Sequence, residues 1–329
     1  MSCHVGFAVA TFARTWGVRR FAHVLANVAT IGFLMLGSQA ILRADDLDRT
    51  AVVALSPELW ERCLDVLRRG LKSIDDTPTS FWPAMHAAEA LTLAGQGAEV
   101  VALLKERLPK EIDHQRRCGL AREMVRAGQR EPLDVLFSTL ADEQSNGRVH
   151  AAESLYKVGD VRDGKLMRAA FEQTENLRLQ LMAAAALGRR GDAAAMKRLR
   201  EMLGSEDREI RKICGWVLGL IGDASDVEPL KKTLAAETDE LARAYFVNAL
   251  ACLGDETGRM SLGKNLASND PAVRTYSAEF SGYSRAVEFR PQLIKMLDDE
   301  NVDVRVRAAQ ALVMLSQPPK LYRIIGKAN

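Results

Sequence analysis

Two short motifs in the sequence combine residue types that can bind a metal ion. Each places a glutamate three residues after a histidine: His86-Ala87-Ala88-Glu89 and His150-Ala151-Ala152-Glu153. Residues three apart share one face of a helix, and imidazole and carboxylate groups both bind transition metals. The motifs lie 64 residues apart and no third copy is present. We interpret them as residues that recur because the structural repeat recurs. Metal or ligand contact is the alternative, and we assign no metal or other cofactor.

An aromatic residue beside the first motif is a further candidate for ligand contact. Trp82 stands in the segment Phe81-Trp82-Pro83, four residues before His86. We expect Trp82 to pack in the core at the start of the first repeat, with ligand contact as the alternative. The sequence has no nucleophile elbow, phosphate-binding loop or dinucleotide-binding glycine motif. It therefore assigns no catalytic residue and predicts a protein that is not an enzyme.

The charge of the chain argues against general binding to nucleic acid. The whole chain has a formal net charge of +2, but residues 1–44 contain four arginines and no acidic residue. The rest of the chain has 41 basic and 43 acidic residues, which is far from the basic surface that nucleic-acid binding needs.

The cysteines of the chain are far apart: Cys63, Cys118, Cys214 and Cys252 form no closely spaced pair. We therefore expect buried thiols rather than disulfides or a zinc site.

The first 44 residues have the pattern of an export signal. Arg19 and Arg20 precede an apolar stretch at residues 24–37, and Ser38-Gln39-Ala40 offers a small-x-small cleavage site. The apolar stretch is shorter than the ~20 residues that a membrane span needs. The sequence predicts an exported protein, periplasmic or extracellular, with no membrane span in the mature chain. Retention of the segment as an anchor is the alternative.

Glycine recurs at a regular spacing through the chain. Each of these glycines ends a helical pattern 31 to 33 residues after the previous one, and four of them precede an aspartate. Glycine suits the left-handed position that closes a helix, and aspartate can cap the next helix. Together they predict a repeated helix–turn–helix unit. The positions are Gly95, Gly128, Gly159-Asp160, Gly191-Asp192, Gly222-Asp223 and Gly254-Asp255.

A second set of positions marks the start of the helix before each glycine. An arginine recurs in register at Arg117, Arg148, Arg211, Arg243, Arg274 and Arg305. Four residues before most of these arginines stands Asp113, Asp207, Asp239, Asp270 or Asn301. We expect the aspartates to cap their helices, and the arginines to form an Asp–Arg ladder along the stacked repeats. Both roles belong to the scaffold rather than to catalysis.

The motif Asp-x-x-Val/Ile-Arg, followed by an Ala-rich run that ends in Leu and Gly-Asp, resembles the HEAT-like repeats named after the phycobilisome lyases. The clearest copy runs from Asp207 to Asp223, and the resemblance covers residues 80–317. It implies an all-α fold, an α-solenoid in which about eight helix pairs form a right-handed superhelix on the order of 70–80 Å long. For function it implies a non-catalytic scaffold or adaptor that binds a protein partner.

Some enzymes are built on similar repeats. Proteins of the deoxyhypusine hydroxylase type hold a di-iron centre with adjacent His-Glu pairs, and this sequence has no His-Glu dipeptide. Bilin lyases share the repeat name, but no lyase-specific motif is present here. The alternatives to a scaffold are a metal- or ligand-dependent enzyme, lyase- or hydroxylase-like, and an envelope- or carbohydrate-binding module.

These features divide the chain into four parts. Residues 1–44 are the expected signal with an N-terminal extension, and residues 45–79 a helical cap with a linker. Residues 80–317 are the expected repeat array, and residues 318–329 a C-terminal tail. We expect the cap helix, which begins after Ser56, to cover the exposed apolar face of the first repeat.

Overall fold

The computed structural model describes residues 52–318. The expected signal at residues 1–44 and all but the first residue of the expected tail lie outside the described residues. Within this range the chain forms sixteen α-helices, three short 3-10 helices and no strand, which confirms the predicted all-α class. None of these helices is long and apolar enough to span a membrane. The α-helices are α2 (Pro57–Lys72), α3 (Pro78–Leu93), α4 (Gly97–Leu104), α5 (His114–Arg126), α6 (Leu133–Ala141), α7 (Arg148–Val158), α8 (Lys165–Phe171), α9 (Leu177–Arg189), α10 (Ala193–Met202), α11 (Arg208–Ile221), α12 (Val227–Ala236), α13 (Glu240–Leu253), α14 (Glu256–Asn265), α15 (Pro271–Tyr283), α16 (Arg290–Met296) and α17 (Val302–Leu315).

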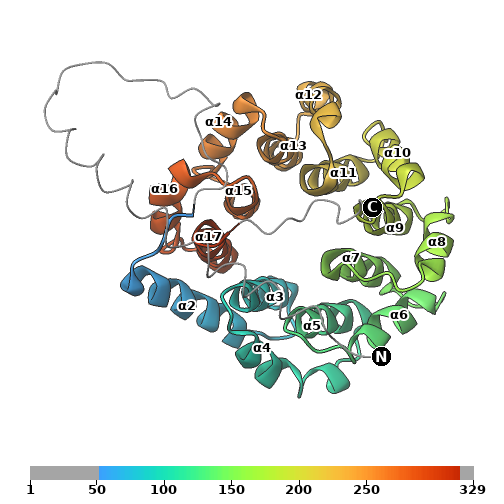
Figure 1. The fold of residues 1–329 in the computed structure, drawn as a ribbon, viewed down its shortest axis with the longest axis horizontal. Helices are drawn as coiled ribbons and strands as arrows, with labels where there is room; N and C mark the ends of the chain where they lie inside the picture. The colour runs from blue at the N-terminus through green and yellow to red at the C-terminus, as the bar shows by residue number, and fades with distance from the viewer. Residues whose placement is uncertain (1–51, 319–329) are drawn as a thin grey trace, which may run out of the picture. The chain divides into compact units, whose positions relative to one another are not determined.

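The described helices form eight pairs, each with one outer and one inner helix (Figure 1). The inner helices carry the odd numbers from α3 to α17, and the outer helices carry the even numbers from α2 to α16. Each inner helix packs on its outer partner and on the next inner helix along the chain. This stacking confirms the predicted α-solenoid of helix pairs.

Five of the eight described inner helices begin at the aspartates and the asparagine that the repeat pattern singles out. Asp207 accepts a hydrogen bond from the backbone N–H of Glu209 at 2.8 Å, and Asp239 accepts one from Ala242 at 2.9 Å. The side chain of Asn301 accepts from two backbone N–H groups of α17. Each cap satisfies donors that the first turn of a helix leaves without a partner. Asp113 and Asp270 cap α5 and α15 in the same way.

The repeat arginines bind the turn before their own helix rather than a capping aspartate. Arg243 and Arg305 donate to backbone carbonyls of that turn. Arg211 also pairs with Glu237 at 2.7 Å, and Arg274 pairs with Asp299 at 2.9 Å. These acids stand two residues before the cap of the next inner helix. The expected Asp–Arg ladder is therefore wrong in its partner, because the acids that these arginines meet are Glu237 and Asp299.

The repeat glycines divide into two kinds. Gly159, Gly191 and Gly254 have φ of 74°, 89° and 94°, the left-handed conformation that glycine adopts without strain, and Gly95 and Gly128 share it. Gly222 differs, because its φ is −75°. A Cβ atom there would lie 2.4 Å from the carbonyl oxygen of Leu218. Gly222 is thus required by a close approach, and the expectation of a left-handed closure at this position is wrong.

The aspartates after these glycines also differ in role. Asp192 and Asp255 cap α10 and α14 through hydrogen bonds from Ala195 and Gly258. Asp223 caps only a short 3-10 helix, Ala224–Asp226. Asp160 caps no helix: it accepts from the backbone N–H of Arg162 in a turn, and α8 begins after Gly164. The corner after α7 is therefore longer than the Gly-Asp pattern indicates.

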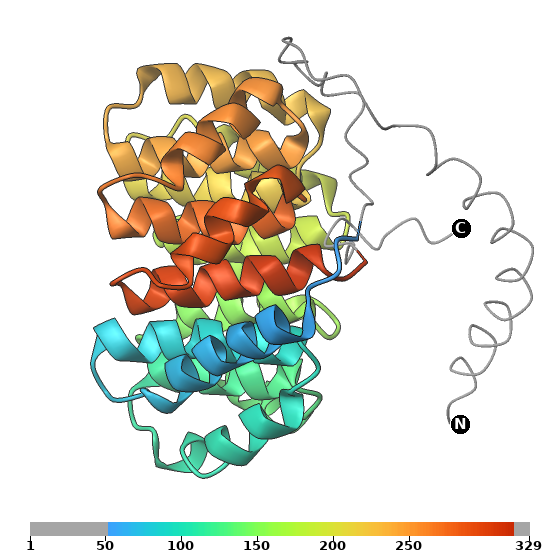
Figure 2. The same cartoon turned by 90° about the vertical axis from the view of Figure 1, so that its left-hand side faces the viewer.

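The array of described helices closes into a ring. The last inner helix, α17, packs against α2 and α3 (Figures 1 and 2). The backbone N–H of Val53 donates to the carbonyl of Leu315 at 3.1 Å, and Arg62 pairs with Asp298 at 2.6 Å. The expected elongated rod is wrong for this reason. The helix α2, which we expected to cap an open end, instead lies over the junction between the first and last repeats.

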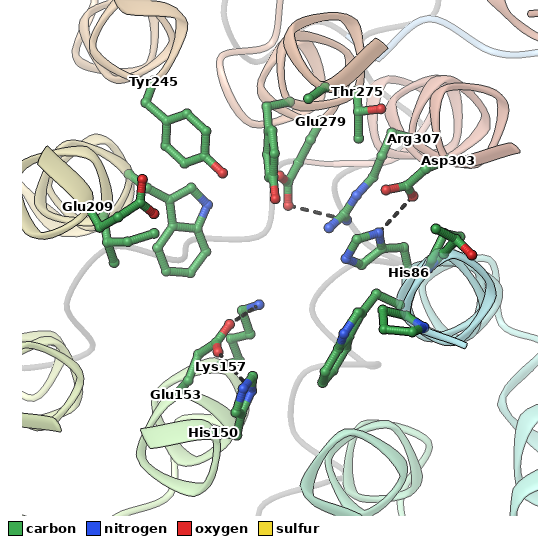
Figure 3. A pocket seen from close by; sticks show the side chains of 18 of the residues that line it. His86, His150, Glu153, Lys157, Glu209, Tyr245, Thr275, Glu279, Asp303 and Arg307 are labelled. Carbon is green, nitrogen blue, oxygen red and sulfur yellow. Dashed lines mark hydrogen bonds and ion pairs between the residues drawn. The ribbon is translucent and has the colours of Figure 1, made fainter. Parts of the chain in front are cut away.

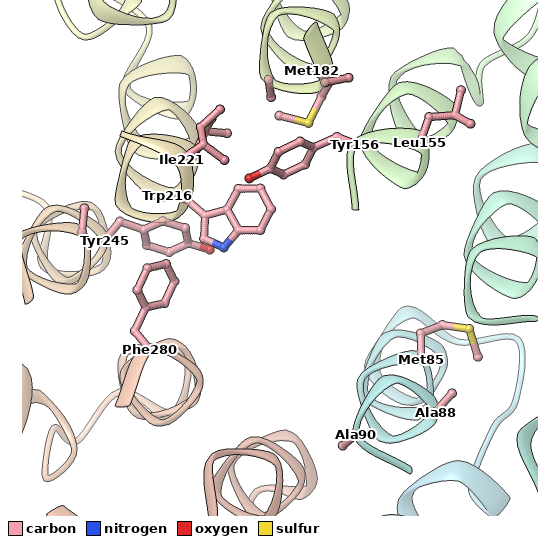
Figure 4. Close-up of a cluster of buried hydrophobic side chains, with 14 of the residues drawn as sticks. Met85, Ala88, Ala90, Leu155, Tyr156, Met182, Trp216, Ile221, Tyr245 and Phe280 are labelled. Atoms are coloured by element: carbon pink, nitrogen blue, oxygen red, sulfur yellow. The ribbon is translucent and has the colours of Figure 1, made fainter. Parts of the chain in front are cut away.

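Alanine-rich inner helices and larger apolar side chains fill the space between the two layers. Leu218 and Phe280 are completely buried. On the inner side of the ring, Trp216 packs edge-on against Tyr156 with ring centroids 5.6 Å apart (Figure 4). Cys63, Cys118 and Cys214 are buried in the same core. Small residues let neighbouring helices approach closely, and the larger ones fill the remaining gaps.

Replacing Leu218 with aspartate tests the repeat register. The side chain is 0% exposed, so Leu218→Asp loses apolar contacts and buries a charge without a partner. We expect the free energy of unfolding to fall by at least about 3 kcal/mol, measured by chemical denaturation. The matched control is Met260→Asp on α14, where the side chain is 58% exposed. An unchanged stability of Leu218→Asp would contradict the register.

Candidate functional site

The inner helices enclose a cavity of about 810 Å³ at the centre of the ring (Figure 3). All eight described inner helices contribute lining side chains, including Arg122 from α5, Met182 from α9 and Tyr245 from α13. Ligand pockets in proteins commonly measure ~300–1,000 Å³. The cavity is therefore large enough to take a ligand, and no single repeat builds it.

The cavity opens at the end of the ring where the inner helices begin. Its floor holds the buried side chains of Trp216, Glu279 and Arg307, which lie two turns or so further along their helices. A ligand would pass from a charged mouth to a floor shielded from water. The exposed lining residues stand in or just before the first turn of their helices, at Pro78, Arg178, Glu209, Pro271 and Glu300.

Two positions of the repeat recur among the residues that line the cavity. Counted from the repeat arginine, the second residue gives His150, Ile213, Tyr245, Tyr276 and Arg307, and the fifth gives Arg122, Glu153, Trp216 and Glu279. Positions three apart lie on one face of a helix, and here that face is turned to the centre of the ring. His86 and Met182 occupy the second position in repeats without the arginine.

A network of buried ion pairs crosses the floor. Arg307 lies 3.3 Å from Glu89 and 3.2 Å from Glu279, and it donates to Gln310 at 2.5 Å. Glu89 also pairs with Arg126 at 3.0 Å. Burial alone would raise the pKa of Glu89, but the charges of Arg126 and Arg307 outweigh it and hold that pKa well below its usual range. Glu89 is therefore ionised and structural.

A histidine–aspartate pair joins the first and last inner helices at the cavity wall. His86 Nδ1 lies 2.7 Å from a carboxylate oxygen of Asp303, and both residues line the cavity. Burial acts to raise the pKa of Asp303, but the charge and the hydrogen bond of His86 outweigh it, so the pKa is lowered. The aspartate orients the imidazole and leaves its other nitrogen for a ligand or water.

Next to this pair along the cavity wall, aromatic and charged side chains of α3 and α7 lie together. The rings of Trp82 and His150 are stacked, with centroids 5.2 Å apart and planes at 10°. Lys157 lies 2.6 Å from Glu153 and 5.2 Å from the ring centre of Trp216. Burial lowers the pKa of His150. Burial would raise the pKa of Glu153, but Lys157 and Arg122 outweigh it and lower that pKa to about 2.

The structure brings four of the five candidate contacts together. Trp82, His86, His150 and Glu153 line the cavity. Trp82 also packs against the hydrophobic core, as expected, and its contact with a ligand stays a prediction. Glu89 instead lies in the ion-pair network behind the wall. Among residues 52–318, no group of three or more His, Cys, Asp or Glu side chains is placed to hold a metal ion.

Sequence reasoning missed five residues that shape the site: Lys157, Trp216, Tyr245, Glu279 and Arg307. Four of them stand at the second or fifth position after a repeat arginine, where polar and aromatic side chains interrupt Ala-rich helices. That register was visible in the sequence. What it could not show is that the same face of every inner helix meets at one cavity.

Lowering the pH should weaken the fold through Glu153. Its pKa is about 2 in the folded protein against 4.5 for an ordinary glutamate, so its ionised form stabilises the fold above pH 4.5. That stability is lost as the pH falls from 4.5 towards 2, by up to about 3 kcal/mol. Unfolding free energies between pH 6 and 2 should fall less steeply for Glu153→Gln than for the wild type. The exposed control Glu106→Gln should keep the wild-type slope, and equal slopes in all three proteins would contradict the assignment.

Comparison with known families adds to this geometry. Two family models match the chain: one for HEAT repeats over residues 165–251, and one for a HEAT repeat over residues 289–317. A search of curated proteins gave no match. The first match spans α8 to α13 and the second spans α16 and α17, so both fall on helix pairs of the ring. HEAT repeats commonly serve as scaffolds for protein interactions. The two matched segments are therefore similar to HEAT repeats, and the stacked helix pairs of the described residues have the same arrangement.

Proposed function

We propose that the protein is a non-catalytic scaffold or adaptor that binds a protein partner at the mouth of the central cavity, in an extracytoplasmic compartment. The observation that carries this proposal is the cavity itself, because all eight described inner helices contribute to it. The use of HEAT repeats as interaction scaffolds in other proteins supports a protein partner.

The volume of the cavity limits what the partner can insert. A space of about 810 Å³ admits a few side chains, such as those of a chain end or a loop tip, but no folded domain. Exposed Arg178 and Glu300 give the mouth charges of both signs, like the polar rim of a protein interface. Below them Trp82 and Trp216 offer aromatic surface, the kind that dominates binding energy at interfaces.

The sequence of residues 1–44 supports the proposed compartment. Arg19 and Arg20, the apolar residues 24–37 and the small residues at Ser38 and Ala40 follow the order of a secretory signal. An exported scaffold would meet its partner outside the cytoplasm, which is the reason to search for that partner among envelope or secreted proteins.

Binding of the protein partner should depend on the charged side chains at the mouth of the cavity. We would express the full chain with a C-terminal tag, crosslink it in intact cells and identify captured proteins by mass spectrometry. The double variant Arg178→Glu, Glu300→Lys should recover at least about tenfold less of one specific protein, because the rim charges reverse. The control is Lys232→Glu on the outer helix α12, also an exposed charge. Equal recovery by the two variants would count against binding at the mouth.

Export should leave a shortened chain. We expect the mature protein in the periplasmic or extracellular fraction to begin at Ile41, after the Ser38-Gln39-Ala40 site, or a few residues later. N-terminal sequencing and intact mass of the purified protein measure this. Substituting Ala40 with arginine should slow cleavage, because the signal site needs a small residue. A chain that keeps Met1 and stays in the cytoplasm would refute the proposed compartment.

A further inference from the structure

A buried carboxylate at the cavity floor has an oxygen with no partner. Glu279, on α15, uses Oε1 to pair with Arg307 at 3.2 Å, and its side chain is 4% exposed. Its second oxygen, Oε2, accepts no hydrogen bond from the described residues. A buried carboxylate oxygen without a donor is costly, and such groups call for a specific reason.

The buried cations that the structure describes at the floor already have carboxylate partners. Arg307, its cationic partner, is shared with Glu89. The other buried bases at the floor are already matched: Arg122 lies 2.5 Å from Glu123, and Lys157 lies 2.6 Å from Glu153. Counted over the lining, five carboxylates face four lysines and arginines. The Nε of Arg307 also makes no hydrogen bond, but the charge of Arg307 already serves two carboxylates. Among the described residues, Oε2 of Glu279 is the one carboxylate oxygen that is buried without a hydrogen-bond donor.

Aromatic rings stand beside this acid. Tyr276 precedes Glu279 by three residues on the same face of α15, and its ring lies 4.6 Å from that of Tyr245. Trp216 of α11 also lines the cavity, and Figure 3 labels Tyr245 and Glu279 there. Two of these rings already face ammonium groups, since Lys157 lies 5.2 Å from Trp216 and Lys212 lies 5.6 Å from Tyr245. Aromatic faces next to a carboxylate are how proteins recognise organic cations.

We propose that the floor of the cavity binds an organic cation, an alkylammonium or alkylguanidinium group, held by Glu279 against the rings of Tyr276 and Trp216. The oxygen Oε2 is covered by its neighbours in the free protein, and rotation about the terminal bond of Glu279, which is broad in energy, presents it to the cation. This inference rests on the proposed function for the source of the cation, a lysine or arginine side chain of the inserted partner segment. A free amine would supply the same chemistry.

Titration calorimetry with small probes tests the proposal on the full chain. The cationic probes are N-acetyl-arginine methylamide and N-acetyl-lysine methylamide, and agmatine supplies the guanidinium without a peptide backbone. The neutral probe is N-acetyl-citrulline methylamide, which has nearly the shape of the arginine probe without its charge. We expect the cationic probes to bind at least about tenfold more tightly than the citrulline probe. Agmatine binding as tightly as the arginine probe would identify a free amine as an equal source.

Two variants connect the binding to the residues. Glu279→Gln should weaken binding of the arginine probe at least about tenfold, and thermal unfolding shows whether the variant keeps its fold. Tyr276→Leu removes one ring without touching the partners of Arg307, so it provides a second test if Glu279→Gln is unstable. The control Glu256→Gln removes an exposed carboxylate on the outer helix α14 and should leave binding within about twofold.

The outcomes separate this inference from the proposed scaffold. Equal binding of the arginine and citrulline probes, or binding that neither Glu279→Gln nor Tyr276→Leu weakens, would overturn the cation site. A captured partner that is lost on charge reversal at the mouth but is retained by Glu279→Gln would keep the scaffold and overturn the partner segment as the source of the cation. Probe binding that depends on Glu279, with no partner captured, would support the cation site and contradict the proposed binding of a protein partner.

Discussion

Arg307 sits in the last inner helix, yet the carboxylates that neutralise it come from two other helices, Glu89 from α3 and Glu279 from α15. Its side chain is only 3% exposed, and a charge so far from water needs partners held in place around it. Only a closed ring brings α3 next to α17. Arg307 can therefore be buried only if the first and last repeats are in contact. The contact of His86 with Asp303 lies across the same junction.

Closure also changes what the inner surface of the repeats can do. In an open superhelix that surface is a long groove, and a partner lies along it. Here the inner faces converge, and the groove becomes a chamber with a charged mouth and a buried floor. The buried charged side chains at the floor need partners of opposite charge. Glu153 pairs with Lys157, and Glu89 pairs with Arg126. The lining groups that this pairing does not use are the ones that remain available to a ligand.

The local architecture could be predicted from the sequence because the residues that cap the helices and form the turns can be recognised within each repeat. Asp207, Asp239 and Asn301 cap their helices because the first turn of any helix needs acceptors, wherever it lies in the fold. Gly222 is an exception to the expected left-handed closure, because its backbone approaches the carbonyl of Leu218 in the last turn of its own helix. Closure was beyond this reasoning. The pair His86–Asp303 joins residues 217 apart in sequence, and a period of 31 to 33 residues carries no information about how tightly successive repeats turn. The candidate contacts Trp82, His86, His150 and Glu153 could be found as unusual residues, but their meeting at one cavity depends on that curvature.

A ring fixes the number of its units in a way that a rod does not. An open solenoid can gain or lose a helix pair at either end, because each repeat contacts only its neighbours. In the closed array, an added or deleted pair would shift α17 away from α2 and α3, and every remaining joint would have to bend differently to restore the contact between Val53 and Leu315. Duplication of single repeats, the usual route by which such arrays lengthen in evolution, is therefore closed to this protein unless the ring opens.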